Sequence, residues 1–194
     1  MIIPGTTSVP SYRRMMIFID GENLVFNYQN TLKNNPQKLK DMVSHLQDVY
    51  VWHPNTVKAT KHEVIRANYY TFAVGSDEQI ASIANDIKQL SFAKDGRSIL
   101  PFYLRPHVFK KDRRDRKSKG VDIQMTVDIL TNVFNNNLDT VLLVTGDGDF
   151  LPIIHEIVRH GKQVYLASFS SGLNAKLLNV VDDHINLDKI YFDL

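Results

Sequence analysis

Two aspartates separated by a single glycine follow an apolar run in the second half of the chain. Residues 140–152 read TVLLVTGDGDFLP, which places Asp147 and Asp149 just beyond the continuous apolar segment 141–144. Such a segment is typical of a strand covered on both faces. Gly146 and Gly148 allow the chain to turn sharply after it. Because open α/β sheets bind ligands at the carboxyl ends of their strands, this pair of acids indicates a functional site.

Two further acids are expected to meet this pair. Asp20 follows the apolar run 15–19 (MMIFI), and Asp122 falls in the first turn of an expected helix over 120–135. If the strands that end at Asp20 and Asp147 are neighbours, their carboxylates converge, and Asp122 can reach the same crevice. Oxygen ligands without cysteine or clustered histidine predict a hard divalent cation, Mg²⁺ or Mn²⁺. Asp149 would hold a second ion, orient a water molecule, or cap the next helix.

Four other polar residues near these acids have two readings each. Asn23 is either an amide ligand or a helix N-cap, and Thr145 either bonds a site carboxylate or is an ordinary strand residue. Asp128 shares the expected helix of Asp122 but lies about 240° around it, as 3.6 residues per turn dictate, which favours a solvated face. Lys119 either contacts a phosphate or is one more solvated lysine.

A strongly basic segment leads into that helix. Residues 110–119 (KKDRRDRKSK) hold seven basic residues and two aspartates, a charge of +5, although the whole chain carries only +2. Charge runs are often solvated loops, but a cationic arm beside an acidic metal site suits a polyanion. The residues expected to contact nucleic acid are Lys110, Lys111, Arg113, Arg114, Arg116 and Lys117. Phe26, Tyr28 and Phe109 could stack unpaired bases, although core packing is the commoner use of aromatic residues.

Strand and helix patterns alternate along the chain. After a loose lead-in over 1–12, strands are expected at 15–19, 63–74, 98–105, 140–146, 163–169 and 184–193. Helices are expected at 24–33, 37–50, 77–92, 120–135, 150–160 and 170–178. The apolar stripe of the helix over 120–135 is predicted to be Ile123, Val127, Leu130 and Phe134. This alternation predicts an α/β fold, a three-layer sandwich with a mostly parallel central sheet.

Length and composition restrict the class of protein. The 194 residues suit one domain over 1–194. The sequence does not determine the oligomeric state, and a homo-oligomer is one of the alternatives. No apolar run reaches the roughly 18 residues that would suggest a membrane span. The first residues lack the pattern of a signal peptide. The absence of cysteine excludes disulfides and thiolate metal sites and fits the cytoplasm, which is the expected location.

Three motifs in this order resemble the NYN domain family, in particular its LabA-like (DUF88) bacterial branch. They are residues 18–24 (FIDGENL), residues 119–122 (KGVD) with Asp128 later on the helix, and residues 145–150 (TGDGDF) with Pro152. The similarity covers nearly the whole chain from about residue 15. It implies a PIN-like (Rossmann-like) fold and metal-dependent ribonuclease activity. It also implies Asp20, Asp122 and Asp147 as the principal metal-site acids, with Asp149 completing the pocket and Asn23 assisting.

Asp128 also matches an aspartate of the family, although the resemblance does not define its role. At one position the sequence departs from the family pattern. Glu22 stands where the family often has a small residue such as serine, so it either adds a carboxylate or narrows the entrance. The sequence thus predicts a ribonuclease that hydrolyses RNA, and single-stranded RNA is the expected substrate. The alternatives are a non-catalytic RNA- or partner-binding regulatory protein on the same fold, and a metal-dependent phosphatase or DNA nuclease.

Overall fold

A computed structural model describes residues 13–34, 39–57, 62–92, 102–111 and 119–193. The predicted lead-in over 1–12 lies outside these residues. So do Arg113, Arg114, Arg116 and Lys117 of the basic segment. Among the described residues, no helix has the length and apolar character needed to cross a bilayer.

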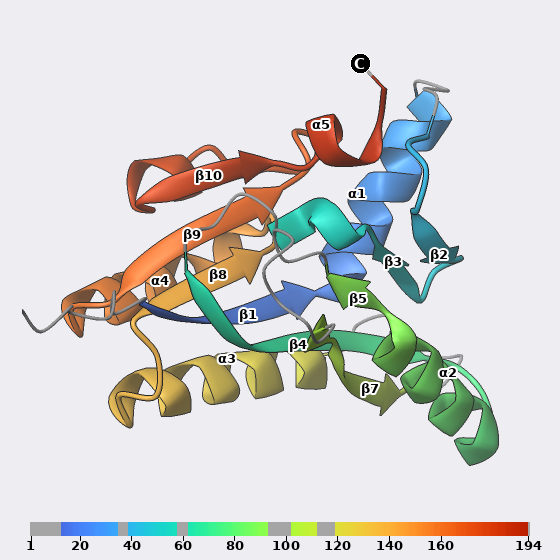
Figure 1. Cartoon of the computed structure of the whole chain (residues 1–194), viewed down its shortest axis with the longest axis horizontal. Coiled ribbons are helices and arrows are strands. Elements are labelled where there is room, and N and C mark those ends of the chain that lie inside the picture. Colours follow the sequence, from blue (N-terminus) through green and yellow to red (C-terminus); the bar gives the residue numbers. More distant parts are fainter. Residues whose placement is uncertain (1–12, 35–38, 58–61, 93–101, 112–118, 194) are drawn as a thin grey trace, which may run out of the picture.

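Six strands form one central sheet in the order β10-β9-β8-β1-β4-β7 (Figure 1). Every neighbouring pair in this sheet is parallel. The strands are β1 (Arg14–Asp20), β4 (Glu63–Ala73), β7 (Arg105–Lys110), β8 (Thr140–Val144), β9 (Gln163–Ser168) and β10 (Asp183–Asn186). Because all run the same way, their carboxyl ends meet at one edge, and β1 and β8 are neighbours as the predicted site requires.

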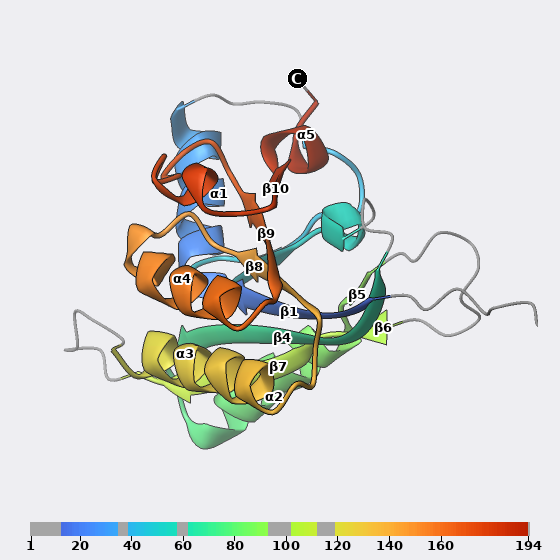
Figure 2. The ribbon, with the colours of Figure 1, turned by 90° about the vertical axis from the view of Figure 1, so that its left-hand side faces the viewer.

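Helices cover both faces of the sheet, which confirms the predicted three-layer α/β fold. The helices are α1 (Gly21–Asn34), α2 (Asp77–Gln89), α3 (Lys119–Phe134), α4 (Leu151–Arg159) and α5 (Asp188–Tyr191). Alternate residues of β1 point to opposite faces. Ile17 packs in one core with residues of α1, α2 and α5, and Phe18 packs in the other with residues of α3 and α4. Figure 2 shows α3 and α4 side by side along their face of the sheet.

Several element predictions were wrong. The expected helix over 37–50 is replaced, in its described part, by turns and a hairpin of β2 (Ser44–Leu46) and β3 (Tyr50–Trp52). Met42 and Asp48 have φ angles of 72° and 59°, which a right-handed helix does not allow. The expected helix over 170–178 is reduced to a short 3-10 turn, η3 (Leu177–Asn179). Two further 3-10 turns are η1 (Pro54–Val57) and η2 (Gly148–Phe150).

Two strand predictions were displaced along the chain. The strand expected over 98–105 lies later, as edge strand β7, and residues 98–101 lie outside the described part. A separate two-stranded sheet pairs β5 (Ser91–Phe92) with β6 (Phe102–Tyr103). The last predicted strand shortens to β10, and α5 occupies residues that were expected to be extended. The edge position of β7 is compatible with Pro106, which cannot donate a backbone hydrogen bond.

The predicted apolar stripe of α3 faces outward. Ile123, Val127 and Phe134 have 62%, 50% and 55% of their surface exposed. The core side of α3 is instead made by Val121, Met125, Ile129 and Val133. Both sets recur at three- or four-residue spacing, so periodicity alone could not decide between them. Phe134 contacts the His160 ring at the end of α4, with 4.7 Å between ring centroids.

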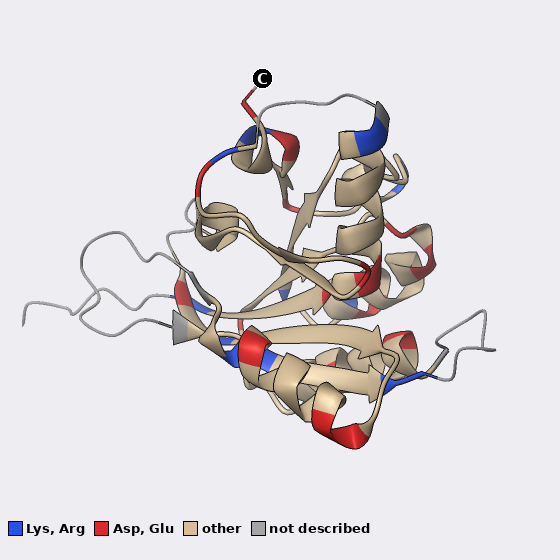
Figure 3. Cartoon of the chain, turned by 90° about the vertical axis from the view of Figure 1, so that its right-hand side faces the viewer, with Lys and Arg blue, Asp and Glu red and all other residues tan. Residues whose placement is uncertain are grey.

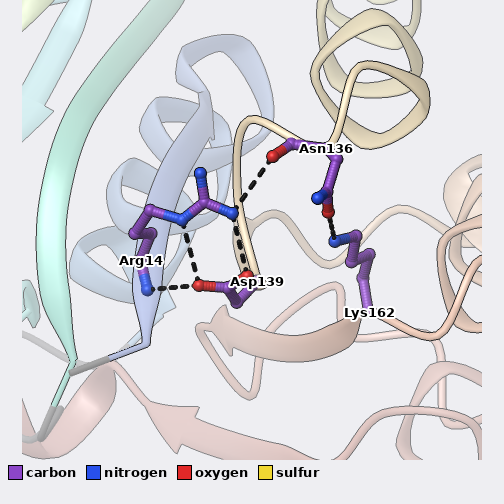
Figure 4. A network of polar contacts seen from close by, with 4 residues as sticks. All are labelled: Arg14, Asn136, Asp139 and Lys162. Atoms are coloured by element: carbon purple, nitrogen blue, oxygen red, sulfur yellow. Dashed lines mark hydrogen bonds and ion pairs between the residues drawn. The ribbon is translucent and has the colours of Figure 1, made fainter. Parts of the chain in front are cut away.

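A polar network ties β1 to β8 at the sheet edge opposite the predicted site (Figure 4). The Arg14 guanidinium donates to both Asp139 oxygens, at 3.0 and 3.1 Å, and to the carbonyl oxygen of Asn136. The Arg14 backbone N–H also donates to Asp139. Lys162 donates to the Asn136 side chain. These contacts fix the start of both strands, while the functional residues lie where the strands end.

Adding one methyl group at Gly21, where β1 meets α1, is expected to lower stability strongly. A Cβ at Gly21 would lie 2.5 Å from the Tyr69 ring and 2.6 Å from the Tyr70 carbonyl oxygen. We expect Gly21→Ala to lower the free energy of unfolding by about 2 kcal/mol, as overpacking does in a tight interior. Thermal and urea unfolding measure this loss.

Gly120 provides the matched control, because an added Cβ there meets no atom within 4 Å. Gly120→Ala should leave stability unchanged or raise it by up to about 1 kcal/mol through helix propensity. Equal stability of the two variants would contradict the close approach of β1 and β4 at Gly21.

Candidate active site

Asp20 is a buried carboxylate at the end of the central strand. It is the last residue of β1, and only 4% of its surface is exposed. Its Oδ1 accepts the backbone N–H of Asn23 at 3.0 Å, which satisfies one of the free amides in the first turn of α1. Its Oδ2 accepts the Thr145 hydroxyl at 2.9 Å. Both oxygens are therefore held in fixed positions by neutral donors.

Thr145 connects this carboxylate to the next loop. Its buried Oγ1 donates to Asp20 and accepts the backbone N–H of Asp147 at 3.1 Å. Of the two readings left open by the sequence, the structure shows the one in which Thr145 bonds a site carboxylate. Because β8 ends at Val144, this hydroxyl lies where the strand gives way to the glycine-rich turn.

Asp147 and Asp149 occupy that turn. Asp147 Oδ1 accepts the backbone N–H of Asp149 at 2.9 Å, so Asp147 caps η2. The expectation that Asp149 caps a helix was therefore wrong, since α4 begins at Leu151 with Phe150 as its N-cap. Asp149 is exposed. The second carboxylate oxygen of Asp147 and both oxygens of Asp149 therefore take no part in capping a helix.

Asn23 fastens α1 to the same turn. Its Oδ1 accepts the backbone N–H of Gly146 at 2.9 Å and the amide of Asn27 at 3.1 Å. An oxygen with two donors is suited to positioning the turn, and Asn23 is not an N-cap because it lies inside α1, which begins at Gly21. The polar residues of β1, α1 and the turn after β8 thus form one continuous hydrogen-bonded unit.

The site acids influence one another electrostatically. Burial raises the pKa of Asp20 to about 7, with smaller contributions from the charges of Asp122 and Glu22. Burial also raises the pKa of Asp122, followed by the charges of Glu22, Asp147 and Asp149. No Lys or Arg whose side chain the structure describes forms a salt bridge with Asp20, Asp122, Asp147 or Asp149. Among the side chains that the structure describes, no cation compensates the charge that these carboxylates share.

The donor chemistry fits a hard divalent cation. A buried carboxylate with a raised pKa and other acids nearby gains from a cation, and these groups supply only oxygen donors. Across the residues that the structure describes, no three His, Asp or Glu side chains lie close enough together to hold a metal ion as they stand. Direct coordination by Asp20, Asp122 and Asp147 therefore stays a prediction, while their convergence on one edge of the sheet is a feature of the fold.

Asp128 lies in a different polar cluster on the inner side of α3. Its Oδ2 accepts the Tyr70 hydroxyl at 2.7 Å and its Oδ1 accepts the Gln124 amide at 2.9 Å. The Tyr70 ring stacks on His107, with 4.4 Å between centroids. Burial, and after it the hydrogen bond and charge of Asp128, raise the pKa of Tyr70, whereas Asp128 is not among the charges that shift the pKa of Asp20 or Asp122. We therefore assign it to holding α3 against β4, and not to the acidic group.

Lys110 and Lys111, the described start of the basic segment, lie at the same edge of the sheet, two strands away from β1. Lys110 ends β7 and forms an ion pair with Asp77 at 2.6 Å. Lys111 Nζ lies 4.0 Å from the centre of the Phe72 ring. In Figure 3 this end of β7 is blue, and the acidic residues at the starts of neighbouring helices are red. Lys119 is the first residue of α3, and so precedes Asp122 by one helical turn.

Sequence reasoning missed the loop that packs against the acidic turn. Asn174 donates its backbone N–H to the Gly146 carbonyl oxygen at 2.9 Å, and Gly172 has a φ of 78°. The Asn27 side chain, 3% exposed, lies against Gly172. The segment SSGLN over 170–174 was interpreted as the start of a helix because its serines resemble N-caps. The dipeptide Ser171-Gly172, with Asn174 two residues further on, was the available signal for a tight loop.

Comparison with known proteins identifies the family. The model of the NYN domain matches residues 14–188, and the chain belongs to the NYN domain family. A curated, uncharacterised protein of Methanocaldococcus jannaschii is 42% identical over 62 residues, 32% of this chain and 26% of that protein. The match thus spans about a quarter of the length of that relative.

A solved structure agrees with the fold. The crystal structure of a protein of unknown function from Vibrio parahaemolyticus matches with a TM-score of 0.59 and 21% identity. The match covers 96% of this chain and 100% of the other. Together with the six-stranded parallel sheet, these findings are consistent with a PIN-like fold, of the kind that NYN domains share with nucleases.

The raised pKa of Asp20 predicts an unusual pH dependence in metal-free protein. An acid whose pKa is higher when folded adds stability below its unfolded pKa, near 4, and this contribution is lost as the pH rises through about 7. Asp20→Asn removes the titration. In EDTA, the variant should be more stable than wild type at pH 8 by ~1–3 kcal/mol, since each pKa unit is worth ~1.4 kcal/mol. The difference should shrink at pH 5. Urea unfolding at both pH values measures it.

Asp139→Asn is the control for this experiment. The hydrogen bonds from Arg14 lower the pKa of Asp139, so its stabilising contribution is present above its unfolded pKa and is lost only in acid. That variant should be slightly less stable than wild type at pH 8, by at most ~1 kcal/mol for an exposed pair. An Asp20→Asn variant that is less stable than wild type at pH 8 would contradict the cost assigned to the buried charge.

The bridging hydroxyl of Thr145 can be removed without changing the shape of the side chain. Thr145→Val leaves Asp20 Oδ2 and the Asp147 N–H without their partner, and each unsatisfied buried group costs ~1–3 kcal/mol. We expect lower thermal stability and weaker Mn²⁺ binding by titration calorimetry. Thr145→Ser keeps the hydroxyl and should restore Mn²⁺ binding. Equal Mn²⁺ affinity of the Val and Ser variants would show that the bridge has no part in the site.

Proposed function

We propose that this chain is a metal-dependent ribonuclease of the LabA-like (DUF88) branch of the NYN family, acting on single-stranded RNA. The observation that carries the proposal is the group of acids at the carboxyl ends of β1 and β8. After burial, the charges of Glu22, Asp147 and Asp149 raise the pKa of Asp122, and the charge of Asp122 in turn contributes to the raised pKa of the buried Asp20. Acids that raise one another's pKa values, with no basic partner among the described side chains, reduce the stability of the fold. Such groups are expected at functional sites.

The acids supply what a hard cation needs. Asp20, Asp122 and Asp147 would hold Mg²⁺ or Mn²⁺, directly or through water. Bound there, such an ion lowers the pKa of a water molecule and neutralises charge on a phosphate. Carboxylates at the mouth of the site would otherwise repel the phosphate backbone, so substrate binding and metal binding should depend on each other.

The other residues of the site have positioning roles. Thr145 holds the Asp20 carboxylate and the backbone of Asp147 at the same time. Asn23 keeps the glycine-rich turn against α1. Asp149, which is exposed next to the turn residue Asp147, would hold a second ion or orient the attacking water. These roles keep the oxygen donors in place before substrate arrives, which lowers the cost of organising them during the reaction.

RNA is favoured over a small phosphate ester by the charge next to the acids. Lys110 and Lys111 lie at the carboxyl edge of the sheet, and the basic segment that they begin leads into the helix that carries Asp122. Basic residues grip the backbone irrespective of sequence, while the acidic site acts on one phosphate. NYN domains are generally nucleases, which also favours an enzyme over a passive binding protein.

Asp147→Asn tests the proposal directly. The substitution keeps the cap to Asp149 through its amide oxygen but removes a charged oxygen donor. We expect cleavage of labelled single-stranded RNA with Mn²⁺ to fall by more than ~100-fold, the upper limit for losing only an outer-sphere partner. RNA binding should survive. Gel-based cleavage and anisotropy binding assays measure the two properties.

Asp86→Asn, at an exposed position on α2, is the matched control and should cleave as wild type does. An Asp147→Asn protein with wild-type cleavage would refute the assigned role. Calorimetry without Mn²⁺ uptake by the wild-type protein would favour a non-catalytic regulatory protein. Faster hydrolysis of single-stranded DNA or of small phosphate esters than of RNA would favour the DNA nuclease or phosphatase alternatives.

A further inference from the structure

A cavity beside the acidic group is lined mainly by neutral side chains, unlike the group of carboxylates proposed to bind the metal ion. It has a volume of about 420 Å³ and lies between α1, the turn after β8 and the loop after β9. Asp147 belongs to its wall, so the cavity opens directly beside the acids. Its other polar side chains are the neutral amides of Asn23, Asn27 and Asn174.

Phe26 contributes an aromatic ring to the same cavity. It lies on α1, one turn after Asn23, and 66% of its surface is exposed, the largest fraction among the exposed large hydrophobic residues of the described chain. The other two aromatic residues considered for base stacking are used differently: Tyr28 is buried, and Phe109 packs against a core cluster. An exposed ring on a rigid helix beside an open cavity is a stacking surface for a flat ligand.

Two amide groups present hydrogen-bond donors to this space. Asn23 Oδ1 accepts the Gly146 N–H, and Asn174 Oδ1 accepts the Lys176 N–H at 3.1 Å. Because backbone N–H groups can only donate, these bonds fix which end of each amide is oxygen. The Nδ2 groups must point elsewhere, and within the described chain neither donates to a protein acceptor.

The loop geometry brings one of these donors close to the acidic turn. A Cβ at Gly148 would lie 2.1 Å from Asn174 Nδ2, so this approach requires a glycine at position 148. The Asn174 N–H bond to the Gly146 carbonyl oxygen holds the two loops together. The donor therefore occupies a defined position next to Asp147.

The lining excludes some ligands. A phosphate is a poor occupant, because the cavity wall carries the Asp147 carboxylate and no Lys or Arg. A flat neutral group with carbonyl acceptors matches an aromatic ring and two NH₂ donors. Among the bases of RNA, uracil has two carbonyl oxygens, whereas cytosine replaces one with an amino donor that would face these donors.

We propose that this cavity, formed by Phe26 with the Asn23 and Asn174 amides, binds one unpaired nucleobase next to the cleaved phosphate and prefers uracil to cytosine. The proposal rests on the proposed nuclease function and adds a base preference to it. The backbone contacts of the basic segment carry no sequence information, so preference must come from contacts of this kind.

Binding of short labelled oligouridylate and oligocytidylate, measured by anisotropy with Ca²⁺ in place of Mn²⁺ and with the oligonucleotides shown on gels to stay intact, tests the cavity without cleavage. Phe26→Ala should weaken binding of both oligonucleotides about 5- to 100-fold, the range expected for losing one stacked base. Phe26→Tyr should restore the affinity. Phe134→Ala removes another exposed ring, 55% accessible, from the outer side of α3 and should bind as wild type does.

Asn174→Asp tests the base preference. The carboxylate keeps an oxygen for the Lys176 N–H but replaces the NH₂ donor with an acceptor. The added charge weakens binding of any RNA, so the informative quantity is the ratio of the two affinities. Wild type should favour oligouridylate, and the variant should reduce or invert that ratio. A ratio unchanged by Asn174→Asp, or equal binding by Phe26→Ala and Phe134→Ala, overturns the proposal.

Cleavage with Mn²⁺, run on the same proteins, separates this proposal from the nuclease proposal. If cleavage depends on Asp147 but not on Phe26 or Asn174, the base-binding proposal is wrong and the nuclease proposal stands. If RNA binding depends on Phe26 but no cleavage is detected, the nuclease proposal is wrong and the protein is a base-binding protein. Absence of RNA binding by the wild-type protein would overturn both.

Discussion

The carboxylate of Asp20 lies between two parallel strands, accepts hydrogen bonds from Asn23 and Thr145, and has no basic partner among the described residues. Removing a charge from water is costly unless another charge compensates it, and neutral donors compensate only in part. The raised pKa of Asp20 expresses this imbalance. The strand that carries Asp20 is fixed at its other end, where Arg14 and Asp139 join β1 to the start of β8.

The surroundings of Asp20 explain why the site includes segments that are far apart in the chain. Thr145 transmits the position of Asp20 to the backbone of Asp147, and Asn23 receives the N–H of Gly146. The carbonyl oxygen of Gly146 in turn accepts the N–H of Asn174. A displacement of any of these groups leaves a polar atom of the next one without its partner. The acidic turn is therefore held from α1 on one side and from the loop after β9 on the other.

The sequence allowed the sheet and the acidic group to be predicted because both depend on local patterns. Apolar runs of strand length marked β1, β4, β8 and β9, and parallel pairing brings their carboxyl ends together without further information. The hairpin over 44–52 was missed because apolar residues at helical spacing also suit a strand pair that inserts Val51 and Trp52 into the core. The outward stripe of α3 was misassigned because this helix is apolar around most of its circumference, and only the sheet decides which side is buried.

The cavity lining could not be predicted because it depends on contacts between loops. Phe26 has the same local pattern as the buried residues of α1, and its exposure follows from the direction in which the helix leaves β1. The free Nδ2 group of Asn174 exists only because its oxygen is used by the backbone of Lys176. Residue types can suggest an amide donor, but its direction is set by a partner that the sequence does not reveal.

The order of strands gives the site a direction. Lys110 and Lys111 lie at the end of β7, the acids at the ends of β1 and β8, and Asn174 in the loop after β9. These positions follow one another along the carboxyl edge of the sheet. With neighbouring strands ~4.8 Å apart, β7 to β9 spans ~19 Å. A nucleic acid strand laid along this edge would place its backbone on the basic residues, one phosphate at the acids and the adjoining base in the amide cavity. The basic residues and the amide cavity therefore lie on opposite sides of the acids, and only the cavity shares hydrogen-bonded backbone with the acidic turn, through Asn174 and Gly146.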